Sequence, residues 1–285
     1  MEEVGTTVGA GTIAAVCVTL CICLILPLII YIVYGVKNKG KGVWSAWLLG
    51  AAGFFVMQII IRVPILNVLS LNEGFLSFAK NHYGWYCLLL AFTAALFELI
   101  GRYAVAKIMS KNLTFERGIA AGLGHGGIEA MVLIGMTYIN NLIYIMMINT
   151  GTFDTMVEQT AALGVDTSSL IVVKESLLST GSAVFLLAGY ERILTMIFHT
   201  AMSLVVCYFV SRKKDFVGIG ICLLCHWLMD FTAAFVNGMT TEYLGNVIST
   251  STAYVIIYVF MTIAAIAAVF GIRKIKNEWS KAIYE

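Results

Sequence analysis

Hydrophobic residues fall in seven long segments, and this pattern predicts seven membrane-spanning helices. The hydrocarbon core of a bilayer, about 30 Å thick, requires about 20 predominantly apolar residues in helical form. The segments cover residues 9–36, 43–69, 85–110, 118–149, 188–211, 216–239 and 246–272. The first follows Glu2 and Glu3 instead of a basic region and is too long for a signal-peptide core, so we interpret it as a true span. The sequence predicts an all-α polytopic membrane helix bundle in which residues 1–285 form a single integral membrane domain.

Lysine and arginine residues between the segments predict the orientation of the chain. Thirteen lie on alternate connections: Lys37, Lys39, Lys41, Lys107, Lys111, Arg117, Arg212, Lys213, Lys214, Arg273, Lys274, Lys276 and Lys281. The opposite connections carry only Lys80 and Lys174. Because cytoplasmic loops are enriched in basic residues, we expect a multi-pass protein of the cell membrane with its N-terminus outside and its C-terminus inside.

The connection formed by residues 150–187 is much longer than a usual loop between helices. It carries Asp154, Glu158, Asp166 and Glu175 against a single lysine, which places it on the outer side. Its last residues, 182–189, are apolar but too few to cross a bilayer. They predict either a re-entrant or interfacial segment or an ordinary amphipathic loop helix.

Composition excludes several classes of protein. Hydrophobic residues make up 60% of the chain and charged residues 12%, and the mean hydropathy is +0.91, which excludes both a water-soluble fold and disorder. The net charge of +2 does not indicate a nucleic-acid partner. All seven cysteines lie in apolar segments, which favours small packing residues over disulfides. Cys222-Leu-Leu-Cys225-His226 matches a haem-attachment pattern, but it lies inside an apolar span, so we reject that interpretation.

Seven ionisable residues on four successive spans are predicted to share one depth. At a rise of 1.5 Å per residue, they fall in a slab about 11 Å thick near the bilayer midplane. They are Glu98, Arg102, His125, Glu129, His199, His226 and Asp230. Six of them form three pairs spaced i and i+4, so each pair projects from one helix face. Because a charge at the bilayer centre costs about 2.5–3.5 kcal/mol on the insertion scale, such residues are functional candidates.

The charges of this group suggest two ways of neutralising it. Three carboxylates and one arginine leave a formal charge of −2, which a divalent cation would cancel. Zinc binds histidine nitrogen and carboxylate oxygen, and a catalytic zinc keeps one position for water. Protonated carboxyl groups are the alternative. Considered singly, Glu98 with Arg102 is also explained as a structural ion pair, and His226 with Asp230 as a satisfied core histidine.

Glycines recur near His125 in the predicted fourth span. Gly118, Gly122 and Gly126 recur every fourth residue, which indicates either close helix packing or space for water or an extended peptide beside His125.

Glu191 and Arg192 lie at the outer start of the fifth span, where their side chains can reach the interface, and Glu191 is a candidate partner of His199. Arg62, two residues before Pro64, is also expected to reach outward to the interface.

Residues 85–235 contain four motifs: Phe97-Glu98-x-x-x-Arg102, Gly124-His125-Gly126-Gly127-x-Glu129-Ala130, Phe198-His199 and His226-x-x-x-Asp230. On successive helices, these motifs resemble the YhfC family of intramembrane metalloproteases. The family is grouped with the PrsW and CAAX-prenyl (Abi) proteases and, more distantly, with the non-enzymatic scaffold subunit of γ-secretase. The glycine-rich motif around His125 is the most specific of the four.

The resemblance implies roles for individual residues. The pattern Glu-Glu-x-x-x-Arg of the related proteases has Phe97 here in place of its first glutamate, the one implicated in activating water in the prenyl proteases, and Glu98 matches the glutamate that partners the arginine. Glu129 is therefore the better candidate base. Arg102 would hold Glu98, Asp230 matches the terminal Asn/Asp of the pattern, and the histidines would bind Zn²⁺ or position the water: His125, His199 and His226.

Together these features predict an intramembrane peptidase that hydrolyses a membrane-associated protein or peptide within the lipid bilayer. A transporter that moves ions or protons through the same group is one alternative, although the chain shows no inverted repeat. A non-catalytic membrane scaffold is the other.

Overall fold

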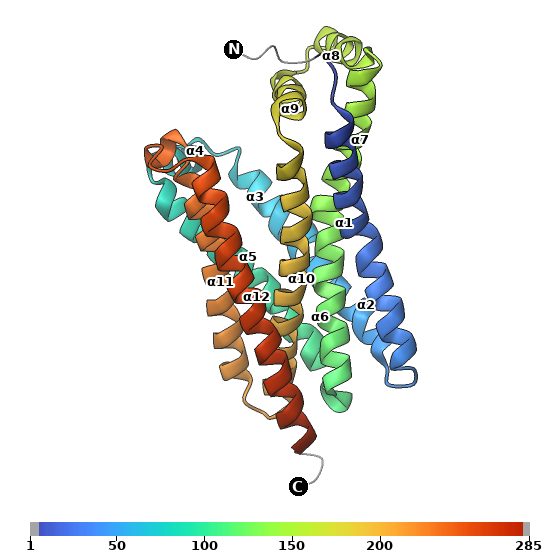
Figure 1. The fold of residues 1–285 in the computed structure, drawn as a ribbon. Helices are drawn as coiled ribbons and strands as arrows, with labels where there is room; N and C mark the ends of the chain where they lie inside the picture. The colour runs from blue at the N-terminus through green and yellow to red at the C-terminus, as the bar shows by residue number, and fades with distance from the viewer. Residues whose placement is uncertain (1–5, 282–285) are drawn as a thin grey trace. The chain divides into compact units, whose positions relative to one another are not determined.

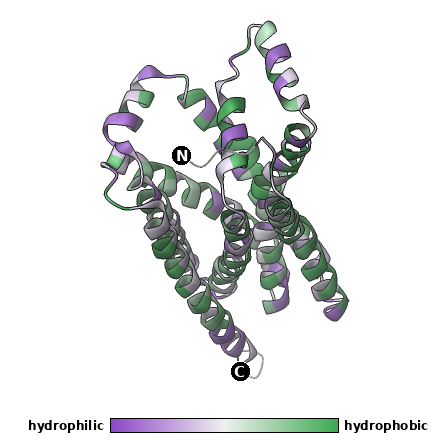
Figure 2. Ribbon diagram, turned by 45° about the horizontal axis from the view of Figure 1, so that its top comes forward, coloured by the Kyte–Doolittle hydropathy of each residue, from purple (hydrophilic) through white to green (hydrophobic). Residues whose placement is uncertain are grey.

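The computed structural model describes residues 6–281, which are almost entirely helical and contain no strand (Figure 1). Within this described part of the chain, seven helices are long and apolar enough to cross a membrane: Ala10–Lys37, Val43–Leu69, Tyr83–Ile108, Phe115–Asn149, Ser182–Ser211, Asp215–Gly238 and Thr250–Lys281. Hydrophobic residues run along most of their length, and hydrophilic residues gather near their ends and in the connections (Figure 2). The seven predicted spans are confirmed, and the orientation of the termini remains a prediction.

The chain divides into two compact units, each assembled from separate stretches of sequence. Unit 1 comprises residues 1–28 and 130–193, and unit 2 comprises residues 29–129 and 194–285. The chain passes between the two units at three places. The boundaries after residues 28 and 193 lie inside helices, and the boundary after Glu129 lies at the end of one. All seven ionisable residues of the predicted group belong to unit 2.

Unit 1 corrects the prediction for residues 182–189. Its elements are the first part of α1 (Ala10–Lys37), η3 (Ala130–Gly135), α7 (Met136–Asn149), α8 (Thr152–Ala162), α9 (Ser168–Ser179) and the first part of α10 (Ser182–Ser211). Residues 182–189 are the opening turns of α10, so they are neither re-entrant nor a separate loop helix. The hydroxyl groups of Thr19 and Tyr138 both donate to the carbonyl oxygen of Phe185, at 2.7 and 3.0 Å, and tie these turns to α1 and α7. The helices within the long connection are α8 and α9.

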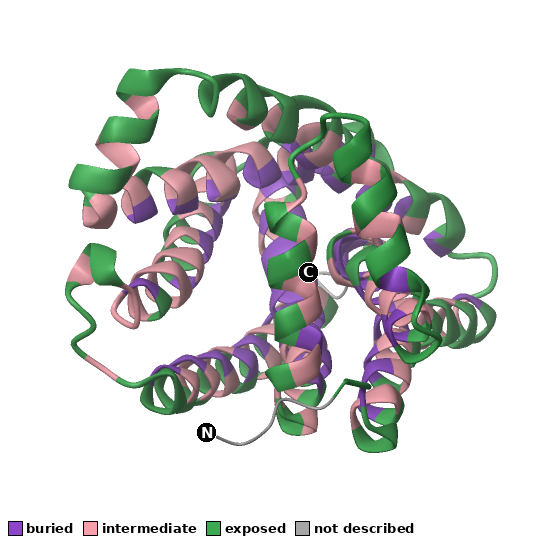
Figure 3. Cartoon of the chain, turned by 90° about the horizontal axis from the view of Figure 1, so that it is seen from above, coloured by how far each residue is buried: buried purple, intermediate pink, exposed green. Residues whose placement is uncertain are grey.

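Unit 2 contains most of the spanning helices. After the end of α1 it comprises α2 (Val43–Phe54), η1 (Phe55–Arg62), α3 (Val63–Leu69), α4 (Glu73–Asn81), α5 (Tyr83–Ile108), η2 (Ser110–Asn112), α6 (Phe115–Glu129), the end of α10, α11 (Asp215–Gly238), η4 (Glu242–Leu244) and α12 (Thr250–Lys281). Helix α2 packs on α5 and α6, and α11 packs on α5 and α12. Buried residues lie along one side of most helices and exposed residues along the other (Figure 3).

Two spans change to π-helix next to the ionisable group. In the second span the π-helical segment η1 (Phe55–Arg62) follows α2, and in the fourth span η3 begins at Ala130, directly after Glu129. A π-helical turn places one extra residue in the turn, so it re-aims side chains, and such turns are frequent at functional sites. The segment η1 carries two polar residues that contact α5, Gln58 and Arg62.

Glycines permit unusually close contact between α2 and α6. A Cβ atom at Gly50 would lie 1.9 Å from the carbonyl oxygen of Ala121, and one at Gly124 would lie 2.1 Å from that of Trp47. Since both obstacles are backbone atoms, neither can move without separating the helices. The predicted series Gly118, Gly122 and Gly126 packs on α10 instead, where a Cβ atom at Gly122 would lie 2.5 Å from Cα of Thr200 and one at Gly126 would lie 3.1 Å from Cα of Met196.

Gly124→Ala is expected to destabilise the protein by about 1–3 kcal/mol, the usual cost of overpacking. Gly220→Ala is the matched control, because Gly220 lies in helix α11 and a Cβ there meets nothing within 4 Å. Thermal unfolding in detergent should show a lower midpoint for Gly124→Ala and an unchanged or higher one for Gly220→Ala. Equal midpoints would contradict the packing.

Candidate active site

Four helices of unit 2 bring the seven predicted residues together. Helix α5 supplies Glu98 and Arg102, α6 supplies His125 and Glu129, α10 supplies His199, and α11 supplies His226 and Asp230. Six of the seven are buried, with exposed fractions between 1% and 7%. Asp230 differs, because its side chain is 33% exposed.

The carboxylate of Glu98 lies at the centre of the group. Its Oε2 accepts a hydrogen bond from Arg102 at 3.0 Å and lies 2.9 Å from Nε2 of His125. The same oxygen lies 3.7 Å from Nδ1 of His199 and 3.6 Å from Nε2 of His226. One carboxylate oxygen thus has a cation and three imidazole rings around it.

The guanidinium of Arg102 determines which nitrogen of two histidines carries a hydrogen. Its Nη2 lies 2.5 Å from Nδ1 of His199, and its Nη1 lies 3.2 Å from Nδ1 of His226. Because a guanidinium has only donors, both Nδ1 atoms must accept. Each ring, when neutral, therefore carries its hydrogen on Nε2. Each of these Nε2 atoms faces a carboxylate. Nε2 of His199 lies 2.8 Å from Oε2 of Glu129, and Nε2 of His226 lies 3.4 Å from Oδ2 of Asp230.

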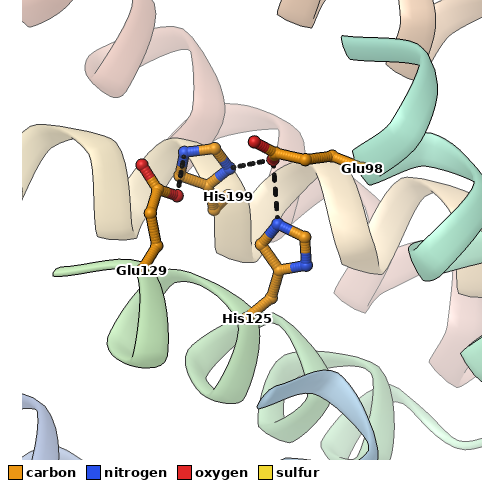
Figure 4. A group of neighbouring side chains, drawn as sticks. All are labelled: Glu98, His125, Glu129 and His199. Carbon is orange, nitrogen blue, oxygen red and sulfur yellow. Dashed lines mark hydrogen bonds and ion pairs between the residues drawn. The ribbon is translucent and has the colours of Figure 1, made fainter. Parts of the chain in front are cut away.

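A subset of the group has the donors and spacing of a metal site. Glu98, His125, Glu129 and His199 each offer one donor atom, and these four atoms lie within 4.8 Å of one another. Figure 4 shows the two carboxylates and two rings turned toward one another, with His199 between Glu98 and Glu129. His226, predicted as a ligand, is not in this subset, and Glu98 takes its place.

The sequence model of the family described as YhfC intramembrane metalloprotease matches residues 22–251. The chain belongs to the YhfC family. A protein of Bacillus subtilis (strain 168), named uncharacterized membrane protein YhfC, is 33% identical over 180 residues, which cover 62% of this chain and 68% of the relative. No solved structure gives a significant match. The predicted family is therefore confirmed.

In this YhfC family member the donor set fits a divalent metal, on one condition. Two imidazoles and two carboxylates, all buried, suit zinc in chemistry and spacing. A neutral histidine that binds metal through Nε2 carries its hydrogen on Nδ1 and donates it to an acceptor. Arg102 is a donor at Nδ1 of His199. His199 can therefore bind a metal only when Arg102 releases that nitrogen.

The π-helical segment η1 adds two residues that the sequence did not assign to the site. Nε2 of Gln58 donates to Glu98 Oε1 at 2.7 Å, and Gln58 is buried. Arg62, expected to reach the interface, instead donates to the carbonyl oxygen of Leu90 on α5 at 2.8 Å and to Gln58 at 3.4 Å. It also interacts electrostatically with Glu98 and Asp230. The outward prediction for Arg62 is wrong, because α5 offers hydrogen-bond acceptors at this depth and the lipid offers none.

Arg62 also changes the charge of the group. With two arginines against the three carboxylates of Glu98, Glu129 and Asp230, the formal charge is −1 instead of −2. At the fifth span, Arg192 is buried and pairs with its neighbour Glu191, so it does not extend to the interface as expected. The carboxylates that the structure places near His199 are those of Glu98 and Glu129.

Gln58→Leu is expected to destabilise the protein by about 1.5–3 kcal/mol, the usual contribution of a hydrogen bond to a charged group. The variant removes the amide that holds Glu98 Oε1 and leaves that buried oxygen without this donor. Gln159→Leu is the control, since Gln159 is exposed on α8 and its replacement should change stability by less than about 0.5 kcal/mol. Chemical unfolding in detergent micelles measures both, and the same loss in the two variants would exclude this role for Gln58.

Proposed function

We propose that this protein is an intramembrane peptidase whose general base is Glu129. The observation that carries the proposal is the buried contact of Glu129 with His199, 2.8 Å between Oε2 and Nε2, beside the Glu98–His125 pair. Hydrolysis needs a base to take a proton from water and a donor for the carbonyl oxygen of the substrate. The group offers both on neighbouring helices.

The geometry supports a separate role for each of these residues in the reaction. Glu129 takes the proton of the attacking water, and His199 orients the carboxylate through its Nε2. His226, whose Nε2 faces the partly exposed side chain of Asp230, donates to the oxyanion that develops on the scissile carbonyl. Arg102 holds Glu98 and fixes both rings in the orientation these steps require. Positioned proton transfer of this kind accelerates reactions by about 10²–10⁴-fold.

The donor set supports a metal-assisted form of the same reaction. His125, His199 and Glu98 would hold the ion once Arg102 releases Nδ1 of His199, which leaves Glu129 as the base. A bound zinc would polarise the carbonyl and lower the pKa of the attacking water. His226, the other predicted ligand, keeps its place beside Asp230.

The substrate is a peptide segment within or next to the bilayer. A helical segment must first lose backbone hydrogen bonds, because an intact helix does not expose its carbonyl carbon to attack. Such unwound backbone is tolerated at this depth only in a polar site. The side chain of Asp230, which is one-third exposed, marks the side from which we expect the segment to reach the buried rings.

Analysis of new peptide N-termini in membranes tests the proposal without a known substrate. Cells that express the wild-type protein should contain cleaved membrane proteins that are absent from cells expressing Glu129→Gln at the same level. Equal sets of N-termini in the two samples would reject a peptidase. Substrate uptake by sealed vesicles in that case would instead favour a transporter.

A further inference from the structure

A small cavity lies between α2, α5, α6 and α10, next to the ionisable group but not part of its contacts. It offers about 10 Å³ of space to the centre of a water molecule. Its lining includes Arg102, His125 and Ser203, together with Gly50 and Ala121 at the close contact of α2 and α6. All of these residues are buried.

Among the described residues 6–281, two polar atoms of the cavity lining have no hydrogen-bond partner. They are Nε of Arg102 and Oγ of Ser203, and both are buried. The other guanidinium nitrogens of Arg102 are satisfied by Glu98, His199 and His226. Because an unpartnered buried donor is costly, such atoms in native proteins normally contact another polar group or an ordered water.

The size and chemistry of the cavity match one water molecule. A site needs about 10–15 Å³ of such space and two to four polar partners to hold a water. A larger ligand does not fit, and an apolar ligand would leave both polar atoms unsatisfied. His125 supplies a third polar side chain, since only its Nε2 is engaged by Glu98.

We propose that this cavity binds a single ordered water, which accepts a hydrogen bond from Arg102 Nε and shares one with Ser203 Oγ. The water completes the hydrogen bonding of the guanidinium, so that Arg102 is fixed at Nε as well as at both terminal nitrogens. Ser203, four residues after His199 on α10, is then a positioning residue that acts on Arg102 through the water. The assignment depends only on the cavity and its lining, and stands apart from the proposed peptidase activity.

Water-edited solid-state NMR on the full chain in deuterated lipid bilayers tests the proposal. The protein carries ¹⁵N-labelled arginine, and the Arg102 Nε signal is identified by its loss in Arg102→Lys. In the wild type we expect rapid transfer of magnetisation from water to Arg102 Nε, although this side chain is only 1% exposed. Absence of transfer in the wild type would overturn the proposal.

Three variants of helix α10, two at Ser203 and one control at Thr200, distinguish this water from any other. Ser203→Val fills the space and removes a partner, so transfer to Arg102 Nε should fall several-fold. Thr200→Val is the matched control, because the Thr200 hydroxyl already donates to the carbonyl oxygen of Met196, and transfer should be unchanged. Ser203→Ala keeps the space with one partner fewer and should give an intermediate rate. Equal transfer in the wild type and both folded Ser203 variants would show that the water lies elsewhere.

Discussion

Glu129→Gln is expected to reduce peptide-bond hydrolysis by about 10²–10⁴-fold, the contribution of a general base. Glutamine keeps the size of the side chain but cannot take a proton from water. The carboxylate lies 2.8 Å from Nε2 of His199 and is buried, with an exposed fraction of 7%. The rate is measured with purified protein in liposomes on a substrate found from the new N-termini.

The control for this variant is Glu158→Gln, which removes an exposed carboxylate on α8. It should hydrolyse the substrate at the wild-type rate. Thermal unfolding must show that the Glu129→Gln protein is folded. A loss of activity can then be assigned to the missing base and not to unfolding. Wild-type activity in a folded Glu129→Gln protein would remove Glu129 from the mechanism.

Arg102→Gln is expected to make the stability of the protein depend on metal. In the wild type, Arg102 neutralises buried Glu98 and occupies Nδ1 of His199. Without it, buried carboxylates lose their closest cation, which costs about 3–5 kcal/mol when one partner of a buried pair is removed. The same change frees His199 for a metal. The variant should therefore unfold at a lower temperature in chelator and recover when zinc is added.

The matched control is Arg273→Gln, since Arg273 is exposed near the cytoplasmic end predicted for α12. Its unfolding temperature should be the same with chelator and with zinc. Metal analysis should show more zinc bound to Arg102→Gln than to the wild type at equal free zinc. If zinc fails to raise the unfolding temperature of Arg102→Gln, the four-residue donor set is not a metal site.

The members of the site could be predicted from the sequence because residue number determines two things in a membrane-spanning helix. It determines the depth of a residue in the bilayer and the face of the helix on which the residue lies. Glu98 and Arg102 are one turn apart on α5, and His125 and Glu129 are one turn apart on α6. The cost of an isolated charge in lipid then requires such pairs to meet. The same periodicity predicted all seven spans.

Other features depend on contacts between helices, which periodicity does not reveal. Gln58 and Arg62 face α5 from a π-helical segment. Because a π-helix has a different number of residues per turn from an α-helix, α-helical spacing does not predict which side of the segment these residues lie on. The hydrogen positions on His199 and His226 follow from a donor on another helix, Arg102. Residues 182–189 were too short to span alone, and only their continuity with the fifth span makes them part of α10.

Hydrolysis in H₂¹⁸O tests the central claim most directly, that this buried group adds water to a peptide bond. Purified protein in liposomes is incubated with the substrate, and the new C-terminus is examined by mass spectrometry. The wild type should add one ¹⁸O atom to that carboxylate, and Glu129→Gln should yield no labelled product above background. Labelled product at equal rates from both proteins, or no cleavage by the wild type, would contradict the account.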